Sequence, residues 1–135
     1  MRIRSIKPDF WTNEKLSALP PETHILAAAL LNYADDEGYF NANPKLIAGA
    51  LFPIRELSGS LPVMLQALST EGGIGYLEVR FSTDKRAYGW IINFSVHQVV
   101  NKPRKSAIKP LFDACSKPAG AAPVALPEPD RTPTW

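Results

Sequence analysis

The apolar residues of this chain follow a helical period in its first half and an alternating period later. The earliest helical segment spans residues 21–34, directly after Pro20. Its apolar positions are Ile25, Leu26, Ala29, Leu30 and Tyr33. These positions share one face, which predicts a helix that buries this face in a core. Gly38 follows the acidic run at 35–37 and suits the left-handed conformation found after helices.

Two further helices are predicted after a brief aromatic strand at residues 39–40. Asn43 and Pro44 are typical of a helix start, which predicts a helix over 44–51. A third helix is expected over 61–71, and Gly72 and Gly73 end it. Gln66, Ser69 and Thr70 lie on its polar face. Across the three helices, the residues expected to be largely buried are Leu26, Leu30, Ile47, Leu51, Leu65 and Leu68.

The period then changes to two, which indicates strands over residues 74–81 and 86–94 joined by a polar turn. Three helices followed by a β-hairpin is the element order of a winged helix-turn-helix domain, in the α+β class. We assign this domain to residues 1–100 and a basic extension, with one helical turn near 111–115, to residues 101–117. Five of the 18 residues in 118–135 are proline, so we expect a disordered Pro/Ala-rich tail there.

Composition is ordinary for a globular domain, with 135 residues of which 45% are apolar and 21% charged. The single cysteine excludes an intramolecular disulfide. No apolar run approaches the ~18 residues of a membrane span, and the first residues lack the apolar stretch of a signal peptide. We therefore expect a cytoplasmic protein with no membrane partner.

Signals for catalysis, metals or cofactors are absent from the sequence. His24 and His97 are 73 positions apart, and Cys115 has no evident base beside it. The acidic run at 35–37 is interpreted as a helix end and turn, since adjacent acids point in different directions. No phosphate-binding glycine loop is present. We expect no enzyme activity, no cofactor and no metal site.

Charge is distributed unevenly along the chain although its net value is only +2. No acid occurs between Lys85 and Phe112, which is typical of a solvated loop or of an electrostatic footprint for nucleic acid. Two groups of cations are candidate phosphate contacts, one at the hairpin turn and one in a flexible arm after the hairpin. They comprise Lys85 and Arg86 in the turn, and Lys102, Arg104 and Lys105 in the arm.

The remaining candidate DNA-binding residues lie on the predicted helices. Gln66, Ser69 and Thr70 would face base edges in the major groove, and Lys45 adds a cation near the start of its helix. Aromatic residues of the hairpin region are expected to pack the core, while Trp90 stays open as a base-stacking candidate. Phe10 and Trp11 are expected to close the core against the first predicted helix.

Several stretches, in the same order, resemble phage and prophage replication proteins of the replisome-organiser type. The resemblance covers roughly residues 1–106. Its motifs are residues 2–8 with Phe10 and Trp11, residues 31–38, residues 43–47, residues 88–89, residues 93–94, residues 97–98 and residues 102–106. It implies a winged-helix replication initiator that binds duplex origin DNA and recruits host replication machinery, with a host helicase or helicase loader as the implied partner.

Two other functions remain open alongside replication initiation. A transcriptional regulator can share the same fold, and fold alone does not separate the two. The third possible function is a protein–protein docking module that acts on a host protein. The absence of lysine and arginine from residues 61–71 favours it. The cations of the hairpin turn and of the flexible arm after the hairpin favour the two DNA-binding functions.

Overall fold

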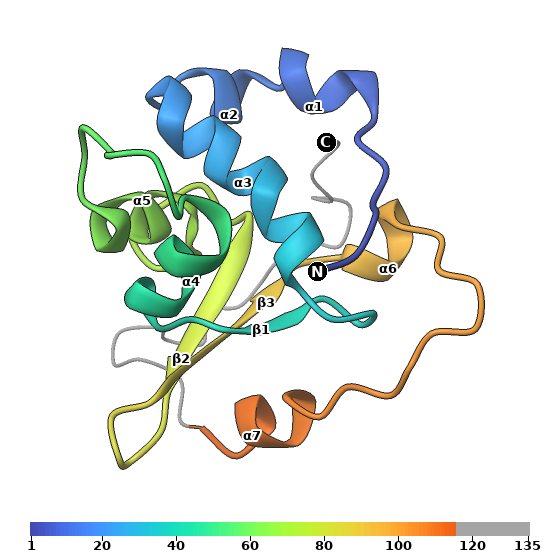
Figure 1. Ribbon diagram of the computed structural model, residues 1–135. Coiled ribbons are helices and arrows are strands. Elements are labelled where there is room, and N and C mark those ends of the chain that lie inside the picture. Colours follow the sequence, from blue (N-terminus) through green and yellow to red (C-terminus); the bar gives the residue numbers. More distant parts are fainter. Residues whose placement is uncertain (116–135) are drawn as a thin grey trace.

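The computed structural model describes residues 1–115, which form a mixed α+β fold (Figure 1). This range contains seven helices: α1 (Pro8–Thr12), α2 (Glu14–Ser17), α3 (Pro21–Tyr33), α4 (Pro44–Leu51), α5 (Leu61–Leu68), α6 (Phe94–His97) and α7 (Lys109–Asp113). Its strands are β1 (Tyr39–Asn41), β2 (Leu77–Phe81) and β3 (Ala87–Ile91). The tail predicted at 118–135 lies outside the described residues. Within residues 1–115, no helix has both the length and the apolar character needed to cross a membrane.

The three strands form one antiparallel sheet in the order β1-β3-β2. The register places Gly89 at the centre, opposite Phe40 on one side and Val79 on the other. A Cβ atom at Gly89 would lie 2.3 Å from the Phe40 ring, so only glycine allows this close approach. Tyr88 and Trp90, the neighbours of Gly89, point to the opposite face of the sheet because side chains alternate along a strand.

Helices α3, α4 and α5 cover one face of the sheet and enclose the main core (Figure 1). Five of the six residues expected to be largely buried are buried there: Leu26, Leu30, Ile47, Leu65 and Leu68. Leu51 is only partly buried. The inward face of α3 differs from the prediction, since Ile25 is 51% exposed while Ala27 and Ala28 are buried. Helices α2, α4 and α5 all contact α3, so small side chains are buried where the helices approach closely.

The opposite face of the sheet is covered by α7, which the chain reaches through a long loop after α6 (Figure 1). Phe112 is 2% exposed and contacts Tyr39 edge-on, with the ring centroids 5.3 Å apart. The Arg80 guanidinium lies 4.2 Å from the Phe112 ring centroid and donates to its carbonyl oxygen at 3.4 Å. The predicted helical turn thus exists two residues earlier than expected, and it anchors the basic extension to the sheet.

Helix α5 ends at Leu68, three residues before the predicted end at Glu71. Ser69 has extended backbone angles and forms a bridge with Leu77. Its hydroxyl donates to the carbonyl oxygens of Gln66 at 2.8 Å and Glu71 at 3.0 Å. A serine that bonds the backbone in this way competes with the helical hydrogen bonds, which explains the early end.

The strands are also shorter than predicted, for local backbone reasons. β2 begins at Leu77 rather than at residue 74, because Gly75 has a positive φ of 80° and breaks the extended conformation. β3 ends at Ile91, and Asn93 adopts a left-handed conformation that starts α6. The short helices α1, α2 and α6 were not predicted, since four or five residues show no clear period. Phe10 on α1 is fully buried as expected, but Trp11 is half exposed.

Candidate nucleic-acid interface

Only two of the three residues predicted to contact bases on or near α5 are exposed. Gln66 is exposed on the helix, and Thr70 is exposed just beyond its end. Ser69 is buried, and both hydrogen bonds of its hydroxyl go to backbone oxygens. The expectation that Ser69 faces the major groove is therefore wrong, because its side chain closes the end of the helix.

The hairpin tip, residues 82–86, projects from the sheet at the lower left of Figure 1. Lys85 has a φ of 68°, and its amide donates to the Ser82 carbonyl oxygen at 3.0 Å, which closes the turn. The Arg86 Nε lies 3.3 Å from an Asp84 carboxylate oxygen in an exposed ion pair. The Ser82 hydroxyl, and then the Arg86 backbone and charge, lower the pKa of Asp84. Asp84 therefore offsets one of the two positive charges that the sequence places at this tip.

An apolar groove lies between α5 and the hairpin. Its volume is about 390 Å³, and Phe81 and Val79 of β2 face Leu65 and Pro62 of α5 across it. The other lining residues are Ala42, Pro44, Gln66, Ser69, Thr70, Glu71 and Ala87. Glu71 is the single charged residue in this lining. Sequence reasoning missed the groove because its walls come from three segments far apart in the chain.

Lys45, the remaining helical candidate, follows Pro44 of the groove wall at the start of α4. The Asn43 side chain accepts a hydrogen bond from the Lys45 amide at 2.9 Å, as predicted for a helix cap. The Lys45 side chain is exposed. Three accessible cations are therefore found near the groove. Lys45 follows one of its lining residues, and Lys85 and Arg86 belong to the tip of the hairpin that borders it.

The basic segment after α6 does not form a free arm. The Arg104 amide donates to an Asp36 carboxylate oxygen at 3.0 Å, and the Ser106 hydroxyl hydrogen-bonds Asp35. Lys102 adopts a left-handed conformation in the same segment. The residues Lys102, Arg104 and Lys105 are all exposed, so their charges are accessible although their backbone is attached to the domain.

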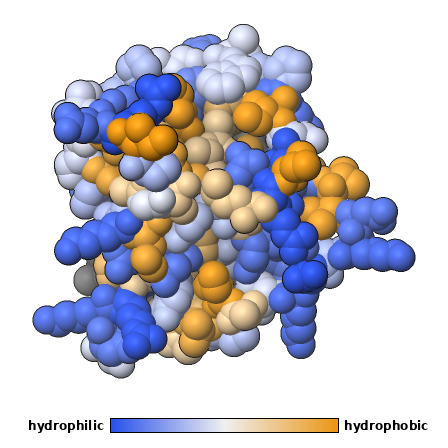
Figure 2. Space-filling view, in the orientation of Figure 1, coloured by the Kyte–Doolittle hydropathy of each residue, from blue (hydrophilic) through white to orange (hydrophobic). Residues whose placement is uncertain are grey.

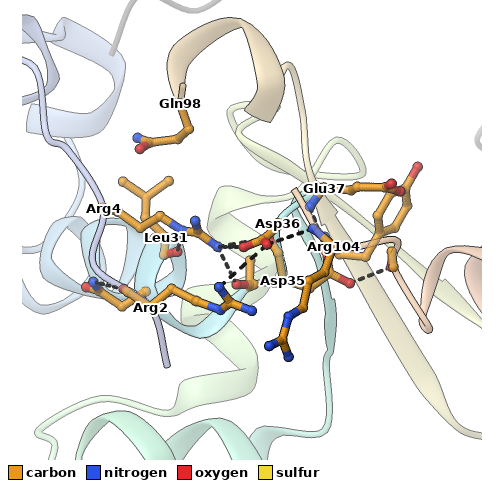
Figure 3. A network of polar contacts seen from close by, with 12 residues as sticks. Arg2, Arg4, Leu31, Asp35, Asp36, Glu37, Gln98 and Arg104 are labelled. Carbon is orange, nitrogen blue, oxygen red and sulfur yellow. Dashed lines mark hydrogen bonds and ion pairs between the residues drawn. The ribbon is translucent and has the colours of Figure 1, made fainter. Parts of the chain in front are cut away.

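The acidic run at 35–37 is the centre of a polar network that ties three distant segments together (Figure 3). The Asp36 carboxylate is 2% exposed and lies 3.3 Å from Arg4 Nη2 and 3.6 Å from Arg2 Nη1. Arg4 also donates to the carbonyl oxygens of Leu31 and Ala34 at 2.9 and 3.0 Å. The Arg104 amide, and then the Arg4 side chain and the two arginine charges, lower the pKa of Asp36 against the effect of its burial.

Gln98 attaches the N-terminal segment to α6 in the same region. Its side-chain oxygen accepts from the Ser5 amide at 3.1 Å, and its side-chain nitrogen donates to the Ser5 carbonyl at 2.7 Å. The sequence singled out Arg4 and Gln98 only as parts of the resemblance, and Asp36 also as part of a helix end and turn. The structure shows that their side chains are occupied within the domain, so these motifs carry structural contacts.

Other candidates for chemistry have structural roles. Trp90 stacks on Tyr39 with the ring centroids 5.9 Å apart, and its indole nitrogen donates to the Glu37 carbonyl oxygen at 3.3 Å. Cys115 is buried against the sheet, and burial raises the pKa of its thiol. His24 lies against Phe10, and a ring nitrogen is 3.0 Å from the Phe10 carbonyl oxygen. Within the part of the chain described, no group of three or more His, Cys, Asp or Glu side chains is arranged to hold a metal ion.

The six cations predicted to contact DNA form two separate groups. Helices α4 and α5 and the hairpin tip lie on the left of Figure 1, whereas the loop with Lys102, Arg104 and Lys105 runs along the right. Figure 2, in the same orientation, shows strongly hydrophilic side chains projecting at the lower left and at the right of the molecule. We call the set Lys45, Lys85 and Arg86 the hairpin group, and the set Lys102, Arg104 and Lys105 the loop group. Searches against family models, curated proteins and solved structures found no match to this chain.

Proposed function

We propose that α3, α4, α5 and the β2–β3 hairpin form a winged-helix domain that binds duplex DNA. The element order and the sheet order β1-β3-β2 agree with that architecture. In it, α5 takes the place of the recognition helix and the hairpin tip takes the place of the wing. The single observation that carries the proposal is that the exposed side of α5 lies beside a projecting hairpin with two exposed cations at its end.

Phosphate contacts dominate the proposed binding. The outward side of α5 carries no lysine or arginine, so affinity comes from the hairpin group. The loop group is on the other side of the domain, where it contacts a more distant stretch of the same duplex. Gln66 and Thr70 face base edges as neutral donors and acceptors.

The biological role that we propose is replication initiation of a phage or prophage. Its support is the ordered set of motifs over residues 1–106, several of which converge on the Asp36 network. In this role the domain binds origin duplex in a bacterial host cell and helps to recruit a host helicase or helicase loader. A transcriptional regulator would use the same surface, and the genes that neighbour its own in the genome would separate the two roles.

A second candidate function is docking on a host protein, which two observations favour. The groove beside α5 is lined mainly by apolar side chains, as in many protein-binding clefts. Glu71 at its edge would repel phosphate. If the domain is a docking module, the groove receives an apolar side chain of the partner.

The test is a fluorescence-anisotropy titration of the full chain with duplex DNA at several salt concentrations. Three phosphate contacts by the hairpin group give a slope of about −3 for log affinity against log salt, and contacts by the loop group move it towards about −5. We expect Lys85→Ala/Arg86→Ala to weaken binding to all sequences and to flatten the slope by about two.

The matched control is Lys7→Ala/Lys15→Ala, which removes the same charge from exposed residues at and near α1 and α2. These helices lie at the top of Figure 1, far from the hairpin. The control should retain most of the affinity and the slope. Absence of salt-dependent binding at low ionic strength would contradict both DNA-binding roles and favour the docking module.

A further inference from the structure

The outward side of α5 is apolar where a DNA-reading helix usually carries cations. Val63 is 63% exposed and Pro62 is exposed in the first turn. Gln66, one turn further along, is exposed as well. Among the described residues, no hydrogen bond involves the Gln66 side-chain amide, so both its donor and its acceptor are available.

This apolar side continues into the groove. Pro62 and Leu65 form one wall, and Val79 and Phe81 of β2 form the other. Phe81 is 55% exposed, although it belongs to the face of the sheet that packs on the core. A continuous apolar strip therefore runs from the first turn of α5 to the base of the hairpin tip.

Two exposed cations are next to lining residues along the chain, although neither lines the groove itself. Lys45 directly follows Pro44, and Arg86 directly precedes Ala87 at the end of the hairpin tip. A duplex offers base edges in the major groove and phosphates along its borders, where cations near the groove can reach them. Among base edges, the apolar group is the C5-methyl of thymine, and the partner that suits a glutamine amide is adenine.

We propose that this surface reads A·T base pairs, with thymine methyl groups against Pro62 and Val63 and adenine N6 and N7 bonded to Gln66. The inference rests on the proposed DNA binding and names the sequence class that the same surface prefers. Glu71, which also lines the groove, repels phosphate. It thereby favours a placement of the duplex in which the base edges, rather than a phosphate, lie over the strip.

The test replaces thymidine by deoxyuridine in a duplex of A·T pairs and measures the affinity of the full chain by anisotropy. This exchange removes the methyl groups and keeps the base pairing. Burial of one methyl group corresponds to about fourfold in affinity, so we expect a loss of about fourfold for each methyl in contact. In a G·C duplex, 5-methylcytosine should restore part of the affinity.

Two protein variants locate the effect. Val63→Ser should reduce the difference between thymine and uracil duplexes, because only the methyl groups against Pro62 remain in apolar contact, while it keeps the salt slope. Val96→Ser is the matched control, because Val96 is 62% exposed on α6, away from the groove. It should discriminate as the wild-type protein does. Gln66→Ala should reduce the preference for adenine over 7-deazaadenine.

The outcomes separate this inference from the proposed function. Salt-dependent binding with equal affinity for thymine and uracil duplexes overturns A·T reading and leaves DNA binding intact; the groove then suits an apolar side chain of a protein partner. Discrimination that stays at the wild-type level in Val63→Ser also overturns it, since the methyl groups then contact another surface. Failure to bind any duplex contradicts the proposed function itself.

Discussion

The Asp36 network and the hairpin tip both contain an Asp–Arg ion pair with a 3.3 Å separation, yet their surroundings differ. Asp36 and Arg4 have side-chain exposures of 2% and 5%. Asp84 and Arg86 have exposures of 60% and 71%. Removal of one partner from a buried pair strands an uncompensated charge, whereas an exposed pair contributes little to stability. The first pair is therefore structural, and the second is free to meet a charged ligand.

This contrast changes the interpretation of the motifs that carry the resemblance. Arg2, Arg4 and the acidic run contact one another, and the backbone at Arg104 completes the network. Motifs of this kind maintain the fold. The proposed function lies instead in residues such as Gln66, whose side-chain amide makes no hydrogen bond within the described part of the chain.

The largest effect is expected from Asp36→Ala. The substitution leaves the buried Arg4 guanidinium without its carboxylate and should lower the free energy of unfolding by about 3–5 kcal/mol. For a domain of this size the melting temperature should fall by about 12 °C or more. Thermal and urea unfolding measure the loss. Asp84→Ala is the control at the exposed pair, and a comparable loss there would break the comparison.

The two sides of α5 should respond differently to substitution. Leu65 is 6% exposed in the core, so Leu65→Ala should lower the free energy of unfolding by about 2–5 kcal/mol. Val63 is exposed, and Val63→Ser should change stability by about 0.5 kcal/mol or less. Urea unfolding of both variants checks this. Wild-type stability of Leu65→Ala would show that α5 does not pack as described.

The stability contributed by Asp36 should depend on pH. Its pKa is lower in the folded protein than in the unfolded chain, chiefly because the Arg104 amide donates to its carboxylate. The contribution is therefore fully present above the unfolded value of about 3.9 and is lost as the pH falls through the lower folded pKa. The difference in unfolding free energy between wild type and Asp36→Asn should be constant near neutral pH and shrink below about pH 4. A difference that grows on acidification would have the wrong sign.

Arg104 combines both kinds of contact in one residue. Its amide belongs to the Asp36 network, while its side chain is exposed. Arg104→Ala/Lys105→Ala should thus change the unfolding free energy by about 0.5 kcal/mol or less. It should also flatten the salt slope of DNA binding by about two. An unchanged slope, measured by anisotropy titration, would restrict DNA contact to the hairpin group.

The smallest effect is expected from neutralising the acid at the hairpin tip. Asp84→Asn removes the carboxylate that pairs with Arg86 and should raise DNA affinity by a few-fold at low salt. The gain should vanish at high salt, where charge effects between exposed groups are screened. Anisotropy titrations at two salt concentrations check this. A gain that persists at high salt would indicate a conformational change of the turn.

Local patterns predicted the elements well where capping and burial signals agreed. The helix at 44–51 was predicted with its observed bounds, since Asn43 caps it and Pro44 occupies its first position. α3 differs from its prediction by one residue, because the Asp35 side chain accepts from the Glu37 and Tyr39 amides and turns the chain. The predicted end of α5 was wrong because the Ser69 hydroxyl bonds nearby backbone oxygens and because Ser69 forms a bridge with Leu77. The second contact joins segments that are apart in the sequence, so the helical pattern did not reveal it.

The candidate site was predicted only as a set of residue types. The polar turn between two alternating segments placed Lys85 and Arg86 correctly at the hairpin tip. The apolar groove was not predictable, since Pro44, Leu65 and Phe81 meet only after the sheet and helices pack. The attachment of the loop group was missed for the same reason, because Asp36 and Arg104 are 68 residues apart.

The sequence by itself determined the order of α3, α4, α5 and the three strands, the cap at Asn43, most of the buried leucines and the cation-rich second half. These follow from periodicity, backbone preference and charge, all of which act within a few residues. Only the tertiary structure decided which charges are occupied and which are accessible. That division depends on distant segments, because a carboxylate such as Asp36 acquires its partners only when the N-terminal segment and the loop after α6 fold onto the turn after α3.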